Sequence, residues 1–152
     1  MKASRRETFD AIDALLRLSE LVERRRRQLA RGAGLTDPQW RVLEGIEHER
    51  FMPSLFARDR ETARASVSRT LGQLQQRGWI RASIAPGDRR QRSYGLTARG
   101  RQLLGRLQKS REEALEAVWD ALPAGEVADF ARFAGLLADR LEAHAAAVES
   151  TR

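Results

Sequence analysis

The sequence contains no cysteine and only two histidines, His48 and His144, which lie far apart in the chain. Without cysteine there is no disulfide framework, no thiolate metal site and no thiol redox switch. Two isolated histidines also argue against a zinc site, and no phosphate-binding glycine loop or activated nucleophile is recognisable. We therefore expect no metal, no cofactor and no enzyme.

Long apolar runs are missing as well. No stretch approaches the roughly 20 apolar residues of a membrane-spanning helix. The N-terminal sequence MKASRRETFDAID carries charges without the apolar segment that a secretory signal places behind them. These absences predict a cytoplasmic protein with no membrane partner, and the 152 residues suit a single domain.

Positive charge is abundant, with a net charge of +7, but it is unevenly distributed along the chain. Residues 58–111 contain 14 basic and three acidic residues, whereas residues 112–152 contain nine acidic and three basic residues. Lys2 and Lys109 are the only lysines, and the guanidinium groups of the arginines suit bidentate contacts with phosphate and guanine. A GC-rich genome would explain arginine in place of lysine but not this asymmetry, so the pattern favours a polyanionic partner.

Apolar periodicity predicts three helices in the first 60 residues. The first covers residues 5–31 and ends at glycines; its arginine run, Arg24–Arg27, suits either a solvated helix end or a DNA contact. The second begins after Thr36, a suitable N-cap, and a short third helix starts near Pro53. The second helix is expected to turn four apolar residues inward: Trp40, Val42, Leu43 and Ile46.

The fourth predicted helix begins near Thr62, which can cap it, and has the most informative pattern. Its narrow apolar stripe consists of Val67, Leu71 and Leu74. The opposite side would then hold Ala65, Arg69, Gly72 and Gln76, flanked by Ser66, Ser68 and Gln73. Small side chains and one arginine on such a face let a helix enter the major groove of DNA, although ordinary surface helices share the pattern.

A β-hairpin is predicted after this helix. Apolar residues alternate with polar ones on both strands, around a Pro-Gly pair that suits a type II turn: Ile80, Ala82, Ile84, Pro86-Gly87, Tyr94 and Leu96. Because an isolated hairpin is unstable in water, its apolar side is expected to rest against the helices. The order helix, turn, helix, hairpin is typical of a winged helix-turn-helix, with the hairpin tip as the wing.

These residues resemble the multiple-antibiotic-resistance-regulator (MarR) family. The resemblance is carried by SVSRTLGQLQQRGWI, residues 66–80, and by GDRRQRSYGLTARG, residues 87–100. The family motifs fall on a recognition-helix pair, a wing pair and the exit to the next helix: Ser68 and Arg69, Asp88 and Arg90, and Leu96, Thr97 and Gly100. The turn RDRE, residues 58–61, departs from the family, which usually has an apolar residue and a glycine there. The resemblance implies a dimeric transcription regulator that binds a near-palindromic operator and is often released by a small ligand.

We therefore predict a mainly α fold with a small β-hairpin wing, a winged helix-turn-helix with N- and C-terminal dimerisation helices. Residues 1–152 would form one MarR-like domain, with residues 35–110 as its DNA-binding lobe. Residues 1–34 and 111–148 would form a helical dimerisation lobe, because they carry more apolar surface than one small wing domain can cover. An intramolecular helical bundle is the alternative use of this apolar surface.

Candidate DNA contacts lie on the groove-facing helix and the wing. Base edges or phosphates are expected to meet the arginine and serines of the helix, and one or both wing arginines would enter the minor groove. Asp88 would either orient an arginine or only hold the loop. The predicted DNA-binding residues are Arg64, Ala65, Ser66, Ser68, Arg69, Gln73, Asp88, Arg89 and Arg90. Trp40 and His48 could line an effector pocket, although packing explains each equally well.

The predicted function is that of a sequence-specific regulator, a repressor that binds double-stranded DNA as a homodimer and responds to a small-molecule effector. A non-specific nucleic-acid-binding or architectural protein would use the same positive charge. That alternative is weakened for single strands, because the sequence lacks interleaved exposed aromatics on which bases could stack.

Overall fold

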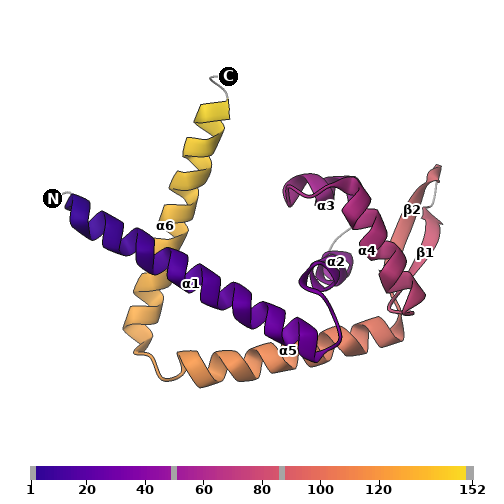
Figure 1. Cartoon of the computed structure of the whole chain (residues 1–152), viewed down its shortest axis with the longest axis horizontal. Helices are drawn as coiled ribbons and strands as arrows, with labels where there is room; N and C mark the ends of the chain where they lie inside the picture. The colour runs from indigo at the N-terminus through magenta and orange to yellow at the C-terminus, as the bar shows by residue number, and fades with distance from the viewer. Residues whose placement is uncertain (1–2, 49–50, 86–87, 150–152) are drawn as a thin grey trace. The chain divides into compact units, whose positions relative to one another are not determined.

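The computed structural model describes residues 3–48, 51–85 and 88–149 (Figure 1). Over these residues it has six helices and one two-stranded sheet, which confirms the predicted mainly α fold with a small hairpin. In chain order the elements are α1 (Arg5–Gly32), α2 (Asp37–His48), α3 (Pro53–Asp59), α4 (Arg64–Gln76), β1 (Ile80–Ala85), β2 (Asp88–Leu96), α5 (Ala98–Trp119) and α6 (Ala124–Glu149). The chain divides into two compact units, Met1–Ser110 and Arg111–Arg152, with the boundary inside α5.

Helix α1 begins at a capping box and confirms the helix predicted over residues 5–31. The Ser4 hydroxyl accepts a hydrogen bond from the Glu7 backbone N–H, and the Glu7 carboxylate accepts one from the Ser4 N–H at 2.7 Å. The helix ends where Gly34, at a φ of 72°, adopts the left-handed conformation that glycine reaches without strain. Helix α1 exposes many large apolar side chains, namely Phe9, Ile12, Leu15, Leu16, Leu18, Leu21 and Val22.

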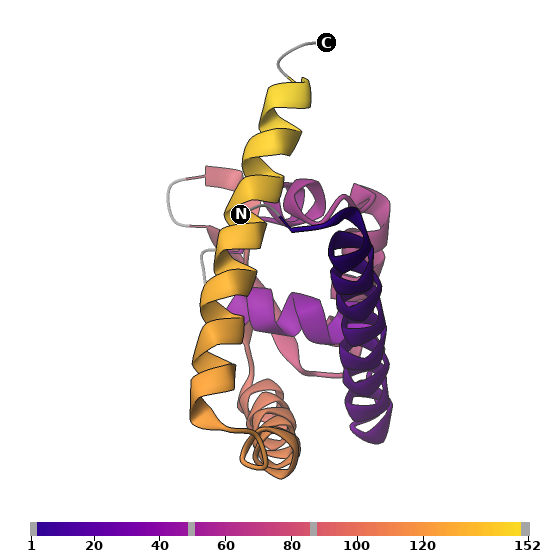
Figure 2. The same cartoon turned by 90° about the vertical axis from the view of Figure 1, so that its left-hand side faces the viewer.

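Arg26 ties α1 to α2, which abuts α1 in Figure 2. Its guanidinium pairs with the carboxylate of Asp37 and, at 2.8 Å, with that of Glu44, and it lies 4.1 Å from the centre of the Trp40 ring. Only 17% of the Arg26 side chain is exposed. The arginine run of α1 therefore includes one residue that is neither a solvated helix end nor available for DNA, because it is part of the joint between two helices.

Helix α2 starts as predicted at Thr36. The Thr36 hydroxyl accepts a hydrogen bond from the Gln39 N–H, while the Thr36 N–H donates to the Gln39 side-chain oxygen at 3.0 Å. All four apolar residues that were expected to turn inward are buried: Trp40, Val42, Leu43 and Ile46.

The turn between α3 and α4 corrects one prediction. Helix α4 has Ala63 as its N-cap, with no side-chain hydrogen bond to the first turn, so Thr62 does not cap it. The Thr62 hydroxyl instead donates to the carbonyl oxygen of Arg60 at 3.1 Å. The physical reason is that Glu61 has a φ of 48°, a left-handed backbone that places Thr62 one residue too early to reach the helix N–H groups.

The hairpin lies beside α4 in Figure 1, and Ile80, Leu96 and Tyr94 pack it against the core. Ile80 pairs with Leu96, and both side chains are buried, whereas Ile84 pairs with Arg92 and is 67% exposed. The expectation that the whole apolar side of β1 rests on the helices is therefore wrong at Ile84, because the outer hairpin extends beyond the helices. The predicted Pro86-Gly87 turn lies outside the described residues.

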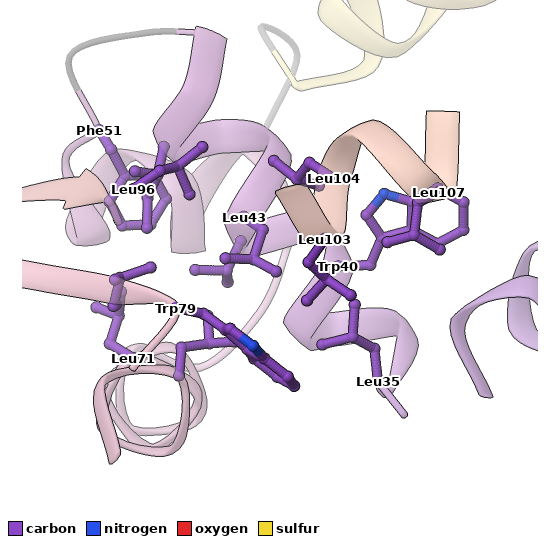
Figure 3. Packing of buried hydrophobic residues seen from close by; sticks show 14 of the residues in the cluster. Leu35, Trp40, Leu43, Phe51, Leu71, Trp79, Leu96, Leu103, Leu104 and Leu107 are labelled. Carbon is purple, nitrogen blue, oxygen red and sulfur yellow. The ribbon is translucent and has the colours of Figure 1, made fainter. Parts of the chain in front are cut away.

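The core of the first unit is shared by α2, α4, the base of the hairpin and the first half of α5 (Figure 3). Thr97 joins the base of the hairpin to α5. Its hydroxyl donates to the Gly78 carbonyl at 2.7 Å and accepts a hydrogen bond from the Gly100 N–H at 3.1 Å. The most deeply buried side chains are Trp40, Leu43, Leu74, Leu104 and Val42.

The second unit comprises the end of α5 and all of α6. The rings of Trp119 and Phe130 meet across the turn that joins these helices, with centroids 6.3 Å apart. No described residue of α6 is buried within the single chain. The exposed large apolar side chains of this unit include Leu115, Val118, Leu122, Phe130, Phe133, Leu136, Leu141 and Val148. Among the described helices, none has the length and apolarity to cross a bilayer.

Candidate nucleic-acid interface

Helix α4 has the two faces predicted from its periodicity. Its apolar stripe, Val67, Leu71 and Leu74, is buried against the rest of the first unit. The other side is solvent-exposed and carries Ala65, Ser66, Ser68, Arg69, Gly72, Gln73 and Gln76. A Cβ atom placed on Gly72 would have no atom within 4 Å, so this part of the helix surface is open. The exposed face thus combines short side chains, amides and one guanidinium.

Two arginines in the first half of α4, Arg64 and Arg69, are exposed and form no ion pair with any described residue. No described carboxylate therefore neutralises their charge, which leaves it available for an electrostatic contact with phosphate. Arg77, just after the helix, differs: it donates to the carbonyl oxygen of Gly34 at 2.6 Å and lies 4.0 Å from the centre of the Trp79 ring. Arg77 therefore fixes the end of α4 against the loop before α2.

Gln73 is held by a residue that sequence reasoning missed. The Gln39 side-chain Nε2 donates a hydrogen bond to the Gln73 Oε1 at 3.0 Å, which joins the start of α2 to the exposed face of α4. Gln39 is 7% exposed and is the one buried polar or charged residue identified in the described part of the chain. The capping-box spacing from Thr36 to Gln39 was a signal for a local bond, but nothing in the sequence pointed to a partner 34 residues away.

The wing residues lie on β2. Asp88 is paired with Ala85 in the ladder, next to a register irregularity between Ile84 and Ala85. The side chains of Asp88, Arg89 and Arg90 lie outside the described part of the structure, so their predicted roles stay predictions. A further wing arginine, Arg92, is exposed opposite Ile84 and was missed, although the alternation of β2 places it with Tyr94 and Leu96.

Two cavities flank α3. One, of about 410 Å³, is bounded by α2, α3 and α4 and reaches Ser66 and Thr70 of the exposed helix. The other, of about 510 Å³, is lined by His48 together with residues of α2 and α3. Phe56 and Arg60 contribute to both. Trp40, the other predicted pocket residue, lines neither: it is 1% exposed, and its indole N–H has no acceptor among the described residues.

Two charged groups at the α1–α2 joint, Asp37 and Arg41, have shifted pKa values. Burial alone would raise the pKa of Asp37, but hydrogen bonds from Arg41 and Arg26 outweigh it and hold that pKa below its usual value. The Asp37 carboxylate raises the pKa of Arg41 further above its ordinary range. Across residues 3–48, 51–85 and 88–149, no three His, Asp or Glu side chains cluster as a metal site would require.

Comparison with known proteins gives a consistent result. The sequence model of the MarR family matches residues 33–91, which run from the loop before α2 into the wing. The transcriptional repressor MprA of Escherichia coli K12 is 28% identical over 150 residues, which cover 93% of this chain and 85% of the relative. Staphylococcus aureus MarR, solved with salicylate and kanamycin, has a TM-score of 0.78 at 14% identity, over 90% of this chain and 93% of that one. A mutant of S. aureus MepR bound to an oligodeoxyribonucleotide has a TM-score of 0.60 at 17% identity, over 92% and 99% of the two chains.

Proposed function

Because the chain belongs to the MarR family of transcription regulators, we propose that it binds double-stranded DNA in a sequence-specific manner and acts as a repressor. The observation that carries this proposal is the exposed face of α4, which joins short side chains to Arg69, an arginine with no ion pair to a described residue, and lies beside a projecting hairpin. A helix with such a face can enter the major groove while the hairpin tip reaches the adjacent minor groove. The MepR mutant with a similar fold is bound to an oligodeoxyribonucleotide, which supports the same use of the fold here.

The helix contacts divide by position. Arg69, with Ser66 and Ser68, is proposed to meet base edges, since these exposed residues lie in the first two turns, where a recognition helix approaches the bases. Ala65 and Gly72 have little or no side chain, so the helix backbone can come close to the bases. Arg64, at the N-terminus of α4, is assigned to phosphate.

The wing contributes its own contacts. Arg89 and Arg90 are proposed to supply the guanidinium that enters the minor groove, whose negative potential attracts arginine where the groove is narrow. Asp88 would orient one of them by a bidentate bond. Replacing Asp88 with alanine tests this role: weaker DNA binding by the folded variant supports it, and unchanged or tighter binding overturns it.

We propose a homodimer, which is supported by the apolar surface that the single chain leaves exposed on α1 and in the second unit. We assign this surface to a two-fold interface, with residues 1–34 and 111–148 as the dimerisation lobe of a single 1–152 domain. The two recognition helices would then read half-sites about 34 Å apart on a near-palindromic operator. Sedimentation equilibrium measures the mass: a monomer at micromolar concentration overturns the assignment.

A small-molecule effector is proposed for the cavity that His48 lines. This cavity shares Phe56 and Arg60 with the one that touches α4, so a ligand there could shift the turn that leads into the recognition helix. The S. aureus MarR of similar fold was solved with salicylate, which supports a small aromatic acid as the first compound to test. Replacing His48 with alanine should lower the affinity for the ligand, while the DNA affinity of the ligand-free protein should stay unchanged.

Selection of duplexes from a random pool, with excess bulk DNA at fixed salt, tests the central proposal. Enrichment of a palindromic motif is the expected result, and its absence favours the alternative of a non-specific or architectural DNA-binding protein. On the enriched operator, Arg69→Ala should weaken specific binding by about 1–3 kcal/mol while sparing random duplex. The matched variant Arg64→Ala should weaken binding to both duplexes to a similar extent.

A further inference from the structure

The Gln39–Gln73 pair connects the start of α2 to the exposed face of α4. Its members are 34 positions apart in the sequence, and the bond between them measures 3.0 Å. Gln39 is buried, whereas Gln73 is exposed on the flank of α4 that also carries Ser66 and Arg69. The pair therefore joins a residue that is fixed by the core to one that a ligand of α4 can reach.

The direction of this hydrogen bond is determined by a backbone group. The Thr36 N–H is a donor and cannot accept, so the atom of the Gln39 amide that faces it at 3.0 Å must be the oxygen. The Gln39 nitrogen is then the atom that faces Gln73, and a nitrogen can only donate. The Gln73 atom that receives this bond must be its oxygen, so the chain from Thr36 orients both amides.

In this orientation only one end of the Gln73 amide is engaged within the described protein. Its oxygen is engaged with Gln39, while its nitrogen donates to no described residue. We propose that Gln73 reads DNA as a hydrogen-bond donor, set in that role by Gln39, and so selects a base edge that presents acceptors in the major groove. This inference rests on the proposed function, because it assumes that α4 occupies the groove.

The chemistry of the base edges makes the selection specific. Guanine presents two acceptors, N7 and O6, and thymine presents O4, whereas cytosine presents the N4 amino donor. A free glutamine commonly pairs with adenine through both amide atoms, since it accepts from N6 and donates to N7. Gln73 cannot turn freely to make that pair, because Gln39 restrains its oxygen. Guanine or thymine is therefore expected at the position that Gln73 reads, and cytosine is disfavoured.

The substitution Gln39→Glu inverts the restraint. A glutamate at this position keeps the capping box, because its carboxylate still accepts from the Thr36 N–H. The carboxylate has no N–H to donate, so Gln73 must turn its own nitrogen toward residue 39 and present its oxygen outward. Since Thr-x-x-Glu is itself a favourable capping sequence, this variant is expected to fold, which circular dichroism and thermal melting verify.

The experiment selects duplexes from a random pool with the full-length wild type, Gln39→Glu and Gln73→Ala. The position at which Gln73→Ala loses its base preference is the one that Gln73 reads. There the wild type should favour guanine over cytosine by about three- to tenfold, and Gln39→Glu should reverse that ratio. Comparing bases within each variant removes the general repulsion between the added carboxylate and DNA.

The outcomes separate this inference from the proposed function. If the wild type enriches no motif, the proposed function is overturned and this inference with it. If a motif is enriched but Gln73→Ala changes no position, or Gln39→Glu leaves the guanine-to-cytosine ratio unchanged, only the role of the pair is overturned. Reversal of the ratio by Gln39→Glu, and its loss in Gln73→Ala, establishes Gln39 as the positioning residue.

Discussion

A Cβ atom on Gly100 would lie 2.1 Å from the carbonyl oxygen of Trp79. The first turn of α5 packs this closely because Thr97 holds both sides of the junction: its N–H donates to the same Trp79 oxygen at 3.1 Å, and its hydroxyl donates to Gly78. The Leu-Thr-x-x-Gly sequence at residues 96–100 thus has a physical basis. Leu96 is buried, Thr97 caps the helix, and only glycine fits at the contact.

Replacing Gly100 with alanine should lower the free energy of unfolding by about 1–3 kcal/mol, the usual cost of forcing an extra carbon into a packed site. The backbone on either side must move, because the obstructing atom belongs to the main chain. Gly105→Ala is the matched control, since Gly105 lies in the same helix with no atom within 4 Å of its would-be Cβ. That variant should gain stability, by about 1 kcal/mol. Urea unfolding of both variants measures the difference, and equal effects would contradict the clash.

Local periodicity accounts for the parts of the fold that could be predicted. The spacing of Val67, Leu71 and Leu74 determined which side of α4 is buried, and the capping pattern at Thr36 located the start of α2. These features depend on residues within a few positions of one another, whose geometry a helix dictates. The exposed face of α4, which carries the proposed DNA contacts, followed from the same pattern.

The features that were missed depend on tertiary contacts or on unusual backbone angles. Gln39 and Gln73 meet because α2 packs against α4. Arg26 is mostly covered because α2 supplies two carboxylates and the Trp40 ring. The sequence predicted Thr62 as the N-cap of α4, but with Glu61 in a left-handed conformation the N-cap is the next residue, Ala63. Alternation alone also could not show how far the helices support the hairpin, so Ile84 was misassigned.

Gly72 offers a test in which stability and DNA binding should move in opposite directions. Glycine costs a helix about 1 kcal/mol relative to alanine, and a Cβ at this position would meet no atom of the free protein. Gly72→Ala should therefore raise the free energy of unfolding by about 1 kcal/mol. If the α4 backbone approaches the groove closely at this point, the same methyl should weaken operator binding. Chemical unfolding and a DNA titration measure the two effects, with Gly105→Ala as a variant that should be stabilised without any loss of binding. Unchanged operator affinity in Gly72→Ala would exclude a close approach at this residue.

Glu61 is the non-glycine residue with a left-handed backbone in the described part of the chain, and it ends the RDRE turn, residues 58–61. A side chain in this conformation destabilises the folded state by roughly 1–2 kcal/mol, which glycine avoids. Glycine also gives the unfolded chain more conformational freedom, and this offsets up to about 1 kcal/mol of the gain. Glu61→Gly should therefore be modestly more stable than Glu61→Ala, which removes the charge but keeps the Cβ. Thermal unfolding of the two variants makes the comparison at constant net charge. Greater stability of the alanine variant would indicate that the turn relaxes in solution.

The Asp37 carboxylate makes stability depend on pH in a defined direction. Burial opposes its charge, but the hydrogen bonds from Arg41 and Arg26 prevail, so its pKa in the folded protein lies below the unfolded value of about 3.9. A lowered pKa stabilises the folded state at every pH above the unfolded pKa, and this stabilisation is lost as the pH falls through the folded value. Asp37→Asn should therefore be less stable than the wild type by a constant amount from about pH 5 to pH 7. Below about pH 4 the difference should narrow, because the wild-type carboxyl then becomes protonated as well.

Urea unfolding across this pH range, with Asp10→Asn as a control for the change in net charge at an exposed position of α1, measures the Asp37 effect. If the gap between the wild type and Asp37→Asn stayed constant down to pH 2, the carboxylate would not be the source of the stabilisation. The joint between α1 and α2 would then depend on Arg26 through its contacts with Glu44 and the Trp40 ring.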